Sequence, residues 1–397
     1  MARKVVIGDL RVQELKRKDG RLSWTIVWPE GGVHQEADRF LRRHEGSGTQ
    51  RTYAHLLVDH LRWLERECLA LATVTLRDLE CYMGLLGAEV RKPLGEPWRV
   101  GKRPYGTAAL ATAAACLKGF YRHQAALGIN GALGKALDQS RLPTRTDRRR
   151  AFLGHTITSM PANPLAPRRG RRRHPKMLPE GARQRLLEVV RAARDRLVVT
   201  WLADGGFRIG ELCGLHLADL HLRDNAVCGE CRSPHVHVCH RPDNPNQARA
   251  KTKHQWSVDE DGTVRGGLIK RVSPAMVHTY FDYLTGEYPR GHARHGMLLV
   301  QLHGDGYGRP WTPTAARRML ARAGSRAGLG KTRPHAFRHG FATAVLDASD
   351  GNLVIARDAG GWASTTVVDE IYAHVDVHDP VFDVALRQVW SGQDASV

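Results

Sequence analysis

The sequence has no hydrophobic run long enough to cross a membrane, and it has few cysteines. No apolar stretch approaches the roughly 20 residues that a transmembrane helix needs. The first residues also lack the apolar segment and cleavage site of a secretory signal. The seven cysteines are an odd number in a chain of 397 residues, which favours reduced thiols over a disulfide framework. We therefore expect a cytoplasmic protein with no membrane partner.

Acidic residues are few relative to basic ones. The chain has 60 Lys and Arg against 40 Asp and Glu, and its formal charge is +20. Because the basic residues cluster rather than scatter, this surplus favours a polyanionic partner over a merely soluble basic protein. Ribosomal and membrane-surface proteins share such a charge, so it indicates a polyanion and names no reaction.

The N-terminal part of the sequence predicts a small β element over residues 1–40. Apolar and polar residues alternate in places over residues 5–28, and Asp19-Gly20 between them is typical of a two-residue hairpin turn. This element is either an arm that touches a nucleic acid or a packed appendage.

Helical spacing replaces this alternation further along the chain. Apolar residues share one face over residues 49–68, and amphipathic helices follow Thr75 and Thr107, which are of a type that caps helix N-termini. We expect a small helical domain over residues 41–140. Basic residues of this domain can contact phosphates, although each alone is as readily explained by a solvated helix face. These candidates are Lys102, Arg103, Lys118 and Arg122.

Residues 141–176 are poor in periodic apolar positions and rich in Arg, Pro and Gly. Such a composition predicts a linker between domains. A basic linker can also follow the phosphate backbone of a nucleic acid, and we favour this role over that of a solvated tether. The run best suited to it is Arg171, Arg172 and Arg173.

Residues 177–397 predict a second domain, which mixes helices with a few strands. A helix over residues 180–203 should end at Asp204-Gly205-Gly206, and a new helix should open around Arg208. Two strands should flank a polar hairpin, and the whole hairpin region, at about residues 223–270, is a long insertion. The expected strands are 235–239 and 268–273, and the expected later helices are 274–287, 313–327, 336–348, 352–360 and 364–373.

The stretch over residues 333–341 places His335 and Arg338 about one helical turn apart, so both side chains can face one target. An imidazole can move a proton near neutral pH, and a guanidinium can hold two phosphate oxygens. Arg208, just after a Gly-Gly turn, can supply a second guanidinium. Attack on a phosphodiester builds negative charge that such cations offset. These residues therefore indicate phosphoryl transfer.

A nucleophile and a general acid complete this chemistry. Tyr372 offers a side-chain oxygen, although a lone tyrosine on a helix is usually a core or rim residue. Trp362 lies between the His/Arg turn and this tyrosine, where it can bury the site and donate its indole N–H. The leaving sugar oxygen needs a proton, which a lysine on a mobile hairpin can give. Lys251 and Lys253 both meet this requirement, and their spacing does not decide between them.

Together these residues resemble the tyrosine recombinases, also called phage integrases. The phrases that match are Phe-Arg-Ile-Gly-Glu-Leu-Cys-Gly-Leu, Arg-Pro-His-Ala-Phe-Arg-His-Gly-Phe-Ala-Thr and Gly-Gly-Trp-Ala-Ser-Thr-Thr. The match is clear over residues 180–378 and weaker over residues 45–135. At the position of Trp362 many members carry His, and the hairpin insertion is long.

The resemblance implies a helical, SAM-like core-binding domain and a mixed α+β catalytic domain, which clamp double-stranded DNA as a homotetramer on paired sites. The arginines would hold the scissile phosphate, the histidine would assist proton transfer, and the lysine would protonate the leaving 5′ oxygen. The tryptophan would support the pocket, and the tyrosine would form a 3′-phosphotyrosine without metal or ATP. The residues implied are Arg208, Lys251, His335, Arg338, Trp362 and Tyr372.

The activity implied is site-specific recombination by the integrase or transposase of a mobile element. The enzyme would work in the cytoplasm, on the bacterial nucleoid, with accessory DNA-bending or directionality proteins as partners. A type IB topoisomerase-like enzyme would share the tyrosine chemistry, and a catalytically inactive DNA-binding regulator would share the fold. The intact catalytic set argues against the regulator, and the linker and core-binding layout favour recombination.

A separate group of cysteines and histidines suggests a structural zinc site. Cys228-x-x-Cys231 has the spacing of half such a site, and Cys239 and His240 can complete a tetrahedron. The alternative is a polar hairpin with incidental thiols, in which residues 235–238 form an ordinary strand with its valines facing inward. Zinc would hold the long insertion together and take no part in catalysis.

Overall fold

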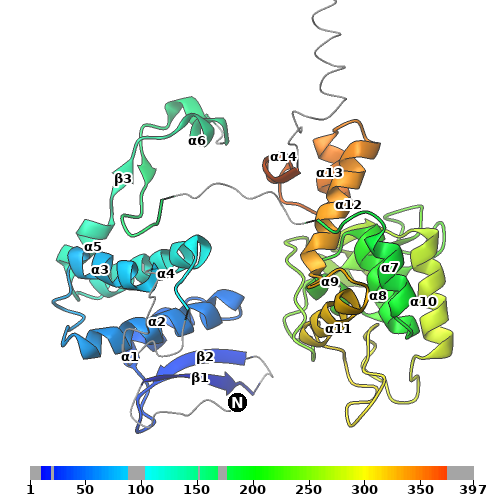
Figure 1. Cartoon of the computed structure of the whole chain (residues 1–397), viewed down its shortest axis with the longest axis horizontal. Helices are drawn as coiled ribbons and strands as arrows, with labels where there is room; N and C mark the ends of the chain where they lie inside the picture. The colour runs from blue at the N-terminus through cyan, green and yellow to red at the C-terminus, as the bar shows by residue number, and fades with distance from the viewer. Residues whose placement is uncertain (1–9, 19–21, 88–102, 151–152, 169–176, 373–397) are drawn as a thin grey trace, which may run out of the picture. The chain divides into compact units, whose positions relative to one another are not determined.

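The computed structural model describes residues 10–18, 22–87, 103–150, 153–168 and 177–372. The chain divides into two compact units, Met1–Arg172 and Arg173–Val397 (Figure 1). Each unit has its own hydrophobic core. Helices dominate and the strands are short, which confirms the prediction of a mainly α fold with a small β component. None of the described helices is both long and apolar enough to cross a bilayer.

The first unit opens with an antiparallel hairpin, as the sequence predicted. β1 (Arg11–Lys16) pairs with β2 (Leu22–Val27), with Lys16 opposite Leu22. Residues 19–21, which contain the predicted turn, lie outside the described residues. The helices that follow are α1 (Gln35–Arg42), α2 (Gly48–Arg66), α3 (Leu76–Gly87), α4 (Thr107–Ala126) and α5 (Gly131–Leu137).

The hairpin and these helices share one hydrophobic core. Ile26 of β2, Leu57 of α2 and Phe120 of α4 are completely buried. His60 of α2 lies in the same core, where its Nε2 is 2.7 Å from the Tyr121 hydroxyl and burial lowers its pKa to about 3. The apolar spacing that predicted the helices therefore marks the faces that pack together, and the hairpin packs with them.

The segment predicted as a linker has local structure in its first half. β3 (Ser140–Arg141) pairs with β4 (Met160–Pro161), and α6 (Arg145–Arg150) and a 3-10 turn lie between them. The Asp147 carboxylate accepts hydrogen bonds from the Arg141 guanidinium and from the backbone N–H of Thr144. Polar contacts rather than apolar periodicity form this structure, so the apolar pattern could not reveal it.

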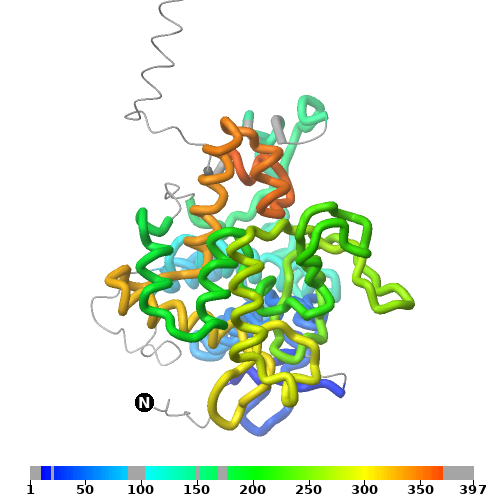
Figure 2. Tube along the Cα trace, turned by 90° about the vertical axis from the view of Figure 1, so that its right-hand side faces the viewer, coloured from blue at the N-terminus to red at the C-terminus, as the bar shows by residue number. Residues whose placement is uncertain are grey.

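The second unit is a helical body in which α8 and α10 pack side by side (Figures 1 and 2). The prediction of one helix over residues 180–203 is wrong, because the chain is extended at Val190 and a second helix begins at Ala193. The Glu287 carboxylate starts that helix by accepting the N–H groups of Ala193 and Arg194 at 2.9 and 3.0 Å. The helices are α7 (Ala182–Val189), α8 (Ala193–Gly205), α9 (Ile209–Cys213), α10 (Pro274–Gly286), α11 (Pro313–Arg326), α12 (Pro334–Ala348), α13 (Leu353–Gly360) and α14 (Thr365–Tyr372).

Two small antiparallel sheets lie between α9 and α10. In the first, β6 (His235–Val238) pairs with β5 (Leu220–His221) on one side and β9 (Leu268–Arg271) on the other, which confirms the two predicted strands. In the second, β7 (Trp256–Val258) pairs with β8 (Val264–Gly266). All four side chains of β6 are buried, so the histidines are as enclosed as the valines that were expected to face inward.

Candidate active site

Arg208 lies at the tight connection between α8 and α9. Gly206 ends α8 with a φ of +56°, and a Cβ there would lie 2.3 Å from the Phe341 ring, so only glycine fits. Arg208 then caps α9, as predicted. Its backbone N–H and its guanidinium both donate to the Glu211 carboxylate, at 2.9 and 2.5 Å. Glu211 is buried, and it therefore fixes the position of the arginine.

Arg338 joins α12 to that same connection. Its side chain is 2% exposed, and its guanidinium donates to the Gly206 carbonyl at 2.6 Å. His335 lies one turn earlier on α12, as the spacing predicted. Burial, then the neighbouring Arg338 and Arg208, lower the pKa of His335. The imidazole is therefore neutral near pH 7 and keeps a lone pair that can accept a proton.

Trp362 follows α13 and packs on Arg338. The central guanidinium carbon of Arg338 lies 4.0 Å from the centroid of the Trp362 ring. The chain reverses through Gly361, whose φ is +69°, and a Cβ on Gly360 would lie 1.4 Å from the indole ring. Both glycines are thus needed to bring the ring back over α13.

Tyr372 is the last residue of α14, the short helix that follows Trp362. Its side chain lies outside the described residues. The helix is anchored one turn earlier by Val368, which is buried in a small cluster with Leu346 of α12 and Ala356 of α13. The backbone of the predicted nucleophile is thereby tied to the helix that carries His335 and Arg338.

A cavity of about 540 Å³ brings three of the predicted residues together. The cavity is lined by Arg208 at the start of α9, by Lys251 in the segment before β7 and by His335 of α12. Lys253 is exposed like Lys251 but does not line this cavity, which favours Lys251 as the general acid. Further cations in the wall are Arg249, Arg317, Lys331 and Arg333. A wall with this charge suits a phosphodiester.

Lys270 of β9 is a residue that sequence reasoning missed. It is 2% exposed, and its ammonium donates to the Gly205 carbonyl at 2.8 Å and the Ala359 carbonyl at 3.0 Å. Burial lowers its pKa to about 7, and Arg338 and Arg208 act in the same direction. The lysine joins the last turns of α8 and α13, which lead to Arg208 and Trp362. Lys270 comes two residues after Leu268 and so shares its face of a predicted strand, and this position could have indicated that the lysine is buried.

The predicted metal ligands do not form the group that the structure brings together. Cys228 is buried and lies near His221 and His237, whereas Cys231, Cys239 and His240 do not belong to that group. His240 Nδ1 instead bonds to the Ala250 carbonyl at 2.8 Å. Burial raises the pKa of the Cys239 thiol to about 12. The pairing of β5 with β6, which spacing along the chain does not reveal, decides which side chains meet.

The residues predicted to contact phosphates in the first unit differ in their surroundings. Lys118 donates a hydrogen bond to the Ala162 carbonyl and is partly buried. The Arg122 guanidinium lies 3.5 Å from the Asp138 carboxylate, and both side chains are more than half exposed. Arg103 is exposed. Lys102, Arg171, Arg172 and Arg173 lie outside the described residues.

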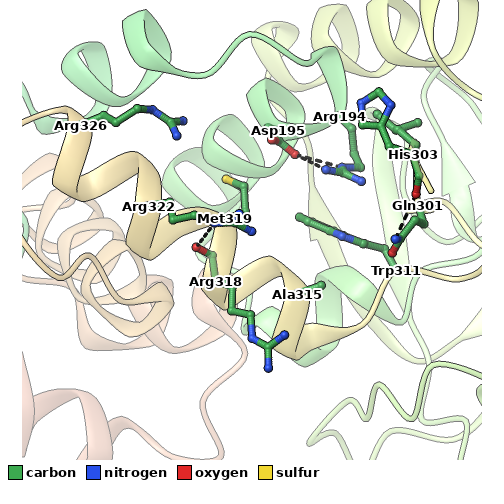
Figure 3. A pocket seen from close by; sticks show the side chains of 11 residues that line it. Arg194, Asp195, Gln301, His303, Trp311, Ala315, Arg318, Met319, Arg322 and Arg326 are labelled. Atoms are coloured by element: carbon green, nitrogen blue, oxygen red, sulfur yellow. Dashed lines mark hydrogen bonds and ion pairs between the residues drawn. The ribbon is translucent and has the colours of Figure 1, made fainter. Parts of the chain in front are cut away.

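A second cavity, of about 430 Å³, lies between α8 and α11 (Figure 3). Arg194 closes one side, with its guanidinium 3.9 Å from the Trp311 ring centroid and hydrogen-bonded to Asp195. Along α11 the cavity is lined by Arg318, Arg322 and Arg326. None of the predicted catalytic residues whose side chains the structure describes lines it, so it is separate from the cavity that holds Arg208.

Comparison with known proteins agrees with this geometry. The model of the Phage integrase family matches residues 176–378. Transposase A from transposon Tn554 of Staphylococcus aureus is 25% identical over 197 residues, which are 49% of this chain and 48% of that protein. Tyrosine recombinase XerC of Pseudomonas syringae pv. tomato is 27% identical over 221 residues, 54% of this chain and 61% of that protein. The chain thus spans only about half the length of the first of these relatives.

Solved structures show the same fold. The Tn1549 transposon integrase in complex with transposon right end DNA gives a TM-score of 0.53 at 16% identity, over 90% of this chain and 97% of that one. XerH site-specific recombinase bound to palindromic difH substrate gives 0.52 at 14% identity, over 86% and 80%. The arrangement around Arg208, His335 and Arg338, the matched fold and the family match lead to one conclusion: the chain belongs to the phage integrase family.

Proposed function

We propose that the protein is a site-specific DNA recombinase of a mobile element, which cuts and rejoins DNA through a covalent tyrosine intermediate. The observation that carries this proposal is the cavity shared by Arg208, Lys251 and His335, with Arg338 bonded to the turn that positions Arg208. A mobile element is favoured because the similar proteins include a transposase of Tn554 and an integrase of Tn1549.

Each of these side chains has one role in the proposed reaction. The Tyr372 oxygen attacks phosphorus and forms a phosphotyrosine bond, while the bond from phosphorus to the sugar 5′ oxygen breaks. His335 accepts the tyrosine proton, since its lowered pKa leaves it neutral. Lys251 gives a proton to the leaving oxygen. Arg208 and Arg338 offset the charge that develops on the phosphate oxygens.

Trp362 supports this site by covering one face of the Arg338 guanidinium. The phosphotyrosine ester retains the energy of the broken bond, so attack by a second strand can reverse the step without ATP. These side chains also supply every charge and proton that the step needs, so the proposed mechanism uses no metal ion.

We assign DNA as the partner of both units. In the first unit we assign phosphate contacts to the exposed Arg103 and Arg122, and to Lys118, which retains further N–H groups beyond the one bonded to Ala162. Recombination joins two sites, so the working form would be a homotetramer on paired DNA, assisted by DNA-bending or directionality proteins. The place of action would be the nucleoid in the cytoplasm.

A nicked suicide substrate tests the proposal. Duplexes taken from the DNA that flanks the gene are nicked beside each candidate cleavage point, so that a short fragment diffuses away and traps the covalent complex. We expect an adduct that resists detergent, and exchange of strands between two labelled duplexes. An adduct with relaxation of supercoils but no exchange would indicate a topoisomerase, and binding without any adduct would indicate a regulator.

A further inference from the structure

A buried group of one cysteine and two histidines lies outside the candidate active site. His221 of β5, Cys228 of the loop after it and His237 of β6 offer ligand atoms that all lie within 4.8 Å of one another. Cys228 and His237 are completely buried. None of the three lines the cavity that holds Arg208, so this group belongs to a different part of the unit.

A backbone hydrogen bond fixes the orientation of the His237 imidazole. His237 Nδ1 lies 2.7 Å from the Gly266 carbonyl, which can only accept, so Nδ1 carries the proton and Nε2 keeps its lone pair. The Nε2 atoms of both His237 and His221 are buried without a hydrogen-bond partner. Such atoms are costly to bury unless something binds them. A histidine whose second ring nitrogen is bonded to a carbonyl is the usual arrangement in metal sites.

His235 supplies a fourth group. It is the cross-strand partner of His221 in the β5–β6 pair, and its ring stacks on that of His221 with centroids 5.1 Å apart. Its Nδ1 lies 2.7 Å from the Ser233 carbonyl, which leaves Nε2 as the lone-pair nitrogen, 3.1 Å from Cys228 Sγ. His235 thus places a third imidazole against the Cys228 thiol, beside the group of three.

We propose that Cys228, His221, His235 and His237 bind one structural zinc ion. Nitrogen and sulfur donors in a closed set of four are what tetrahedral Zn²⁺ takes in structural sites, and hard cations such as Mg²⁺ prefer oxygen. The cysteine would bind as the thiolate and release its proton on binding.

The position of this site gives the ion a mechanical role. It would join β5, β6 and the Cys228 loop, and β6 is the strand that pairs with β9, where Lys270 lies. The same loop is tied to β8, because Arg265 donates to the Cys228 carbonyl at 2.8 Å and the N–H of Gly266 donates to Glu230 at 2.7 Å. The ion would thus brace the base of the β7–β8 hairpin, next to the segment that carries Lys251.

Metal analysis of the full chain tests this inference without any need for recombinase activity. The protein is purified without chelator, and its zinc content is measured by elemental mass spectrometry. We expect about one zinc per chain, release of the metal with a reporter chelator, and a lower unfolding temperature after its removal. Apo protein titrated with Co²⁺ alone should show the charge-transfer absorption of a cobalt–thiolate bond.

Three variants decide the ligand set. Cys228→Ser should lose the zinc and the thiolate band, whereas Cys239→Ser, a buried cysteine outside the group, should keep both. His221→Asn, at a partly exposed strand edge, should also lose the metal and remains informative if Cys228→Ser does not fold. Metal-free protein that takes up no Co²⁺ would overturn the inference. So would full metal content in Cys228→Ser or in His221→Asn.

Discussion

The guanidinium of Arg338 is held between the Gly206 carbonyl and the Trp362 ring. It donates a hydrogen bond to the carbonyl at 2.6 Å, and its central carbon lies 4.0 Å from the centroid of the ring. An arginine with one edge bonded and one face covered keeps a single orientation. The ring thus positions Arg338 rather than taking part in proton transfer.

Replacing Trp362 should therefore slow cleavage without preventing DNA binding. Cation–π contacts contribute about 0.5–2 kcal/mol, so Trp362→Ala should reduce the single-turnover cleavage rate by about 2- to 30-fold. Trp362→Phe keeps a ring over the guanidinium and should lose less. The rate on a suicide substrate is the measurement, and equal rates for Trp362→Ala and wild type would show that the ring does not position Arg338.

Removing the guanidinium of Arg208 should have a larger effect on the chemical step. Single donors that stabilise developing charge are worth about 10²- to 10³-fold in rate, and we expect Arg208→Ala to fall in that range. Arg318→Ala, on α11 outside this cavity, is the matched control and should cleave normally. Gel-shift binding should persist in both variants. Loss of binding in Arg208→Ala alone would point to a role in folding or docking instead.

A change of the leaving group shows whether Lys251 or Lys253 is the general acid. Lys251→Ala should cleave slowly on normal DNA and recover on a substrate whose leaving 5′ oxygen is replaced by sulfur, because a thiolate departs without a proton. Lys253→Ala, which alters an equally exposed lysine that does not line the cavity, should cleave both substrates well. Rescue of Lys253→Ala rather than Lys251→Ala would reverse the assignment.

Lys270 should make stability depend on pH. Its pKa is about 7 in the folded protein against an ordinary value of 10.5. Between these values the unfolded chain binds more protons than the folded one, so the free energy of unfolding should rise with pH. Below about pH 7 the lysine is charged in both states, and its contribution no longer changes with pH.

Urea unfolding of Lys270→Met across this pH range checks the point. The variant should show a smaller rise than wild type, because the group that titrates differently in the two states is gone. Lys253→Met alters an exposed lysine and should leave the slope unchanged. Identical slopes for wild type and Lys270→Met would mean that the buried ammonium stays protonated throughout.

Local signals predicted the parts of the site that lie on single elements. His335 and Arg338 share one helix, so their spacing alone placed them together, and the Gly-Gly break placed Arg208 at a helix start. The contacts between elements could not be predicted in this way. Arg338 reaches Gly206 across 132 positions of the chain, and only the packing of α12 against α8 creates that bond.

The cysteine and histidine group shows the same limit. The C-x-x-C pattern drew attention to Cys231, whereas the structure places Cys228, in a loop, beside His221 of the preceding strand β5. The register of β5 against β6, with His221 opposite His235, brings these rings together. Strand register is set by the whole sheet and its turns, so a four-residue strand carries too little pattern to fix it.

The identity of the nucleophile tests the account most directly. After a trapped cleavage, digestion of the protein and mass spectrometry of the peptide left on the DNA give the residue that carries the phosphate. We expect Tyr372 to carry the phosphate, and Tyr372→Phe should bind DNA yet leave no adduct. An adduct on a serine, or on one of the α10-region tyrosines Tyr280, Tyr283 and Tyr288, would contradict it.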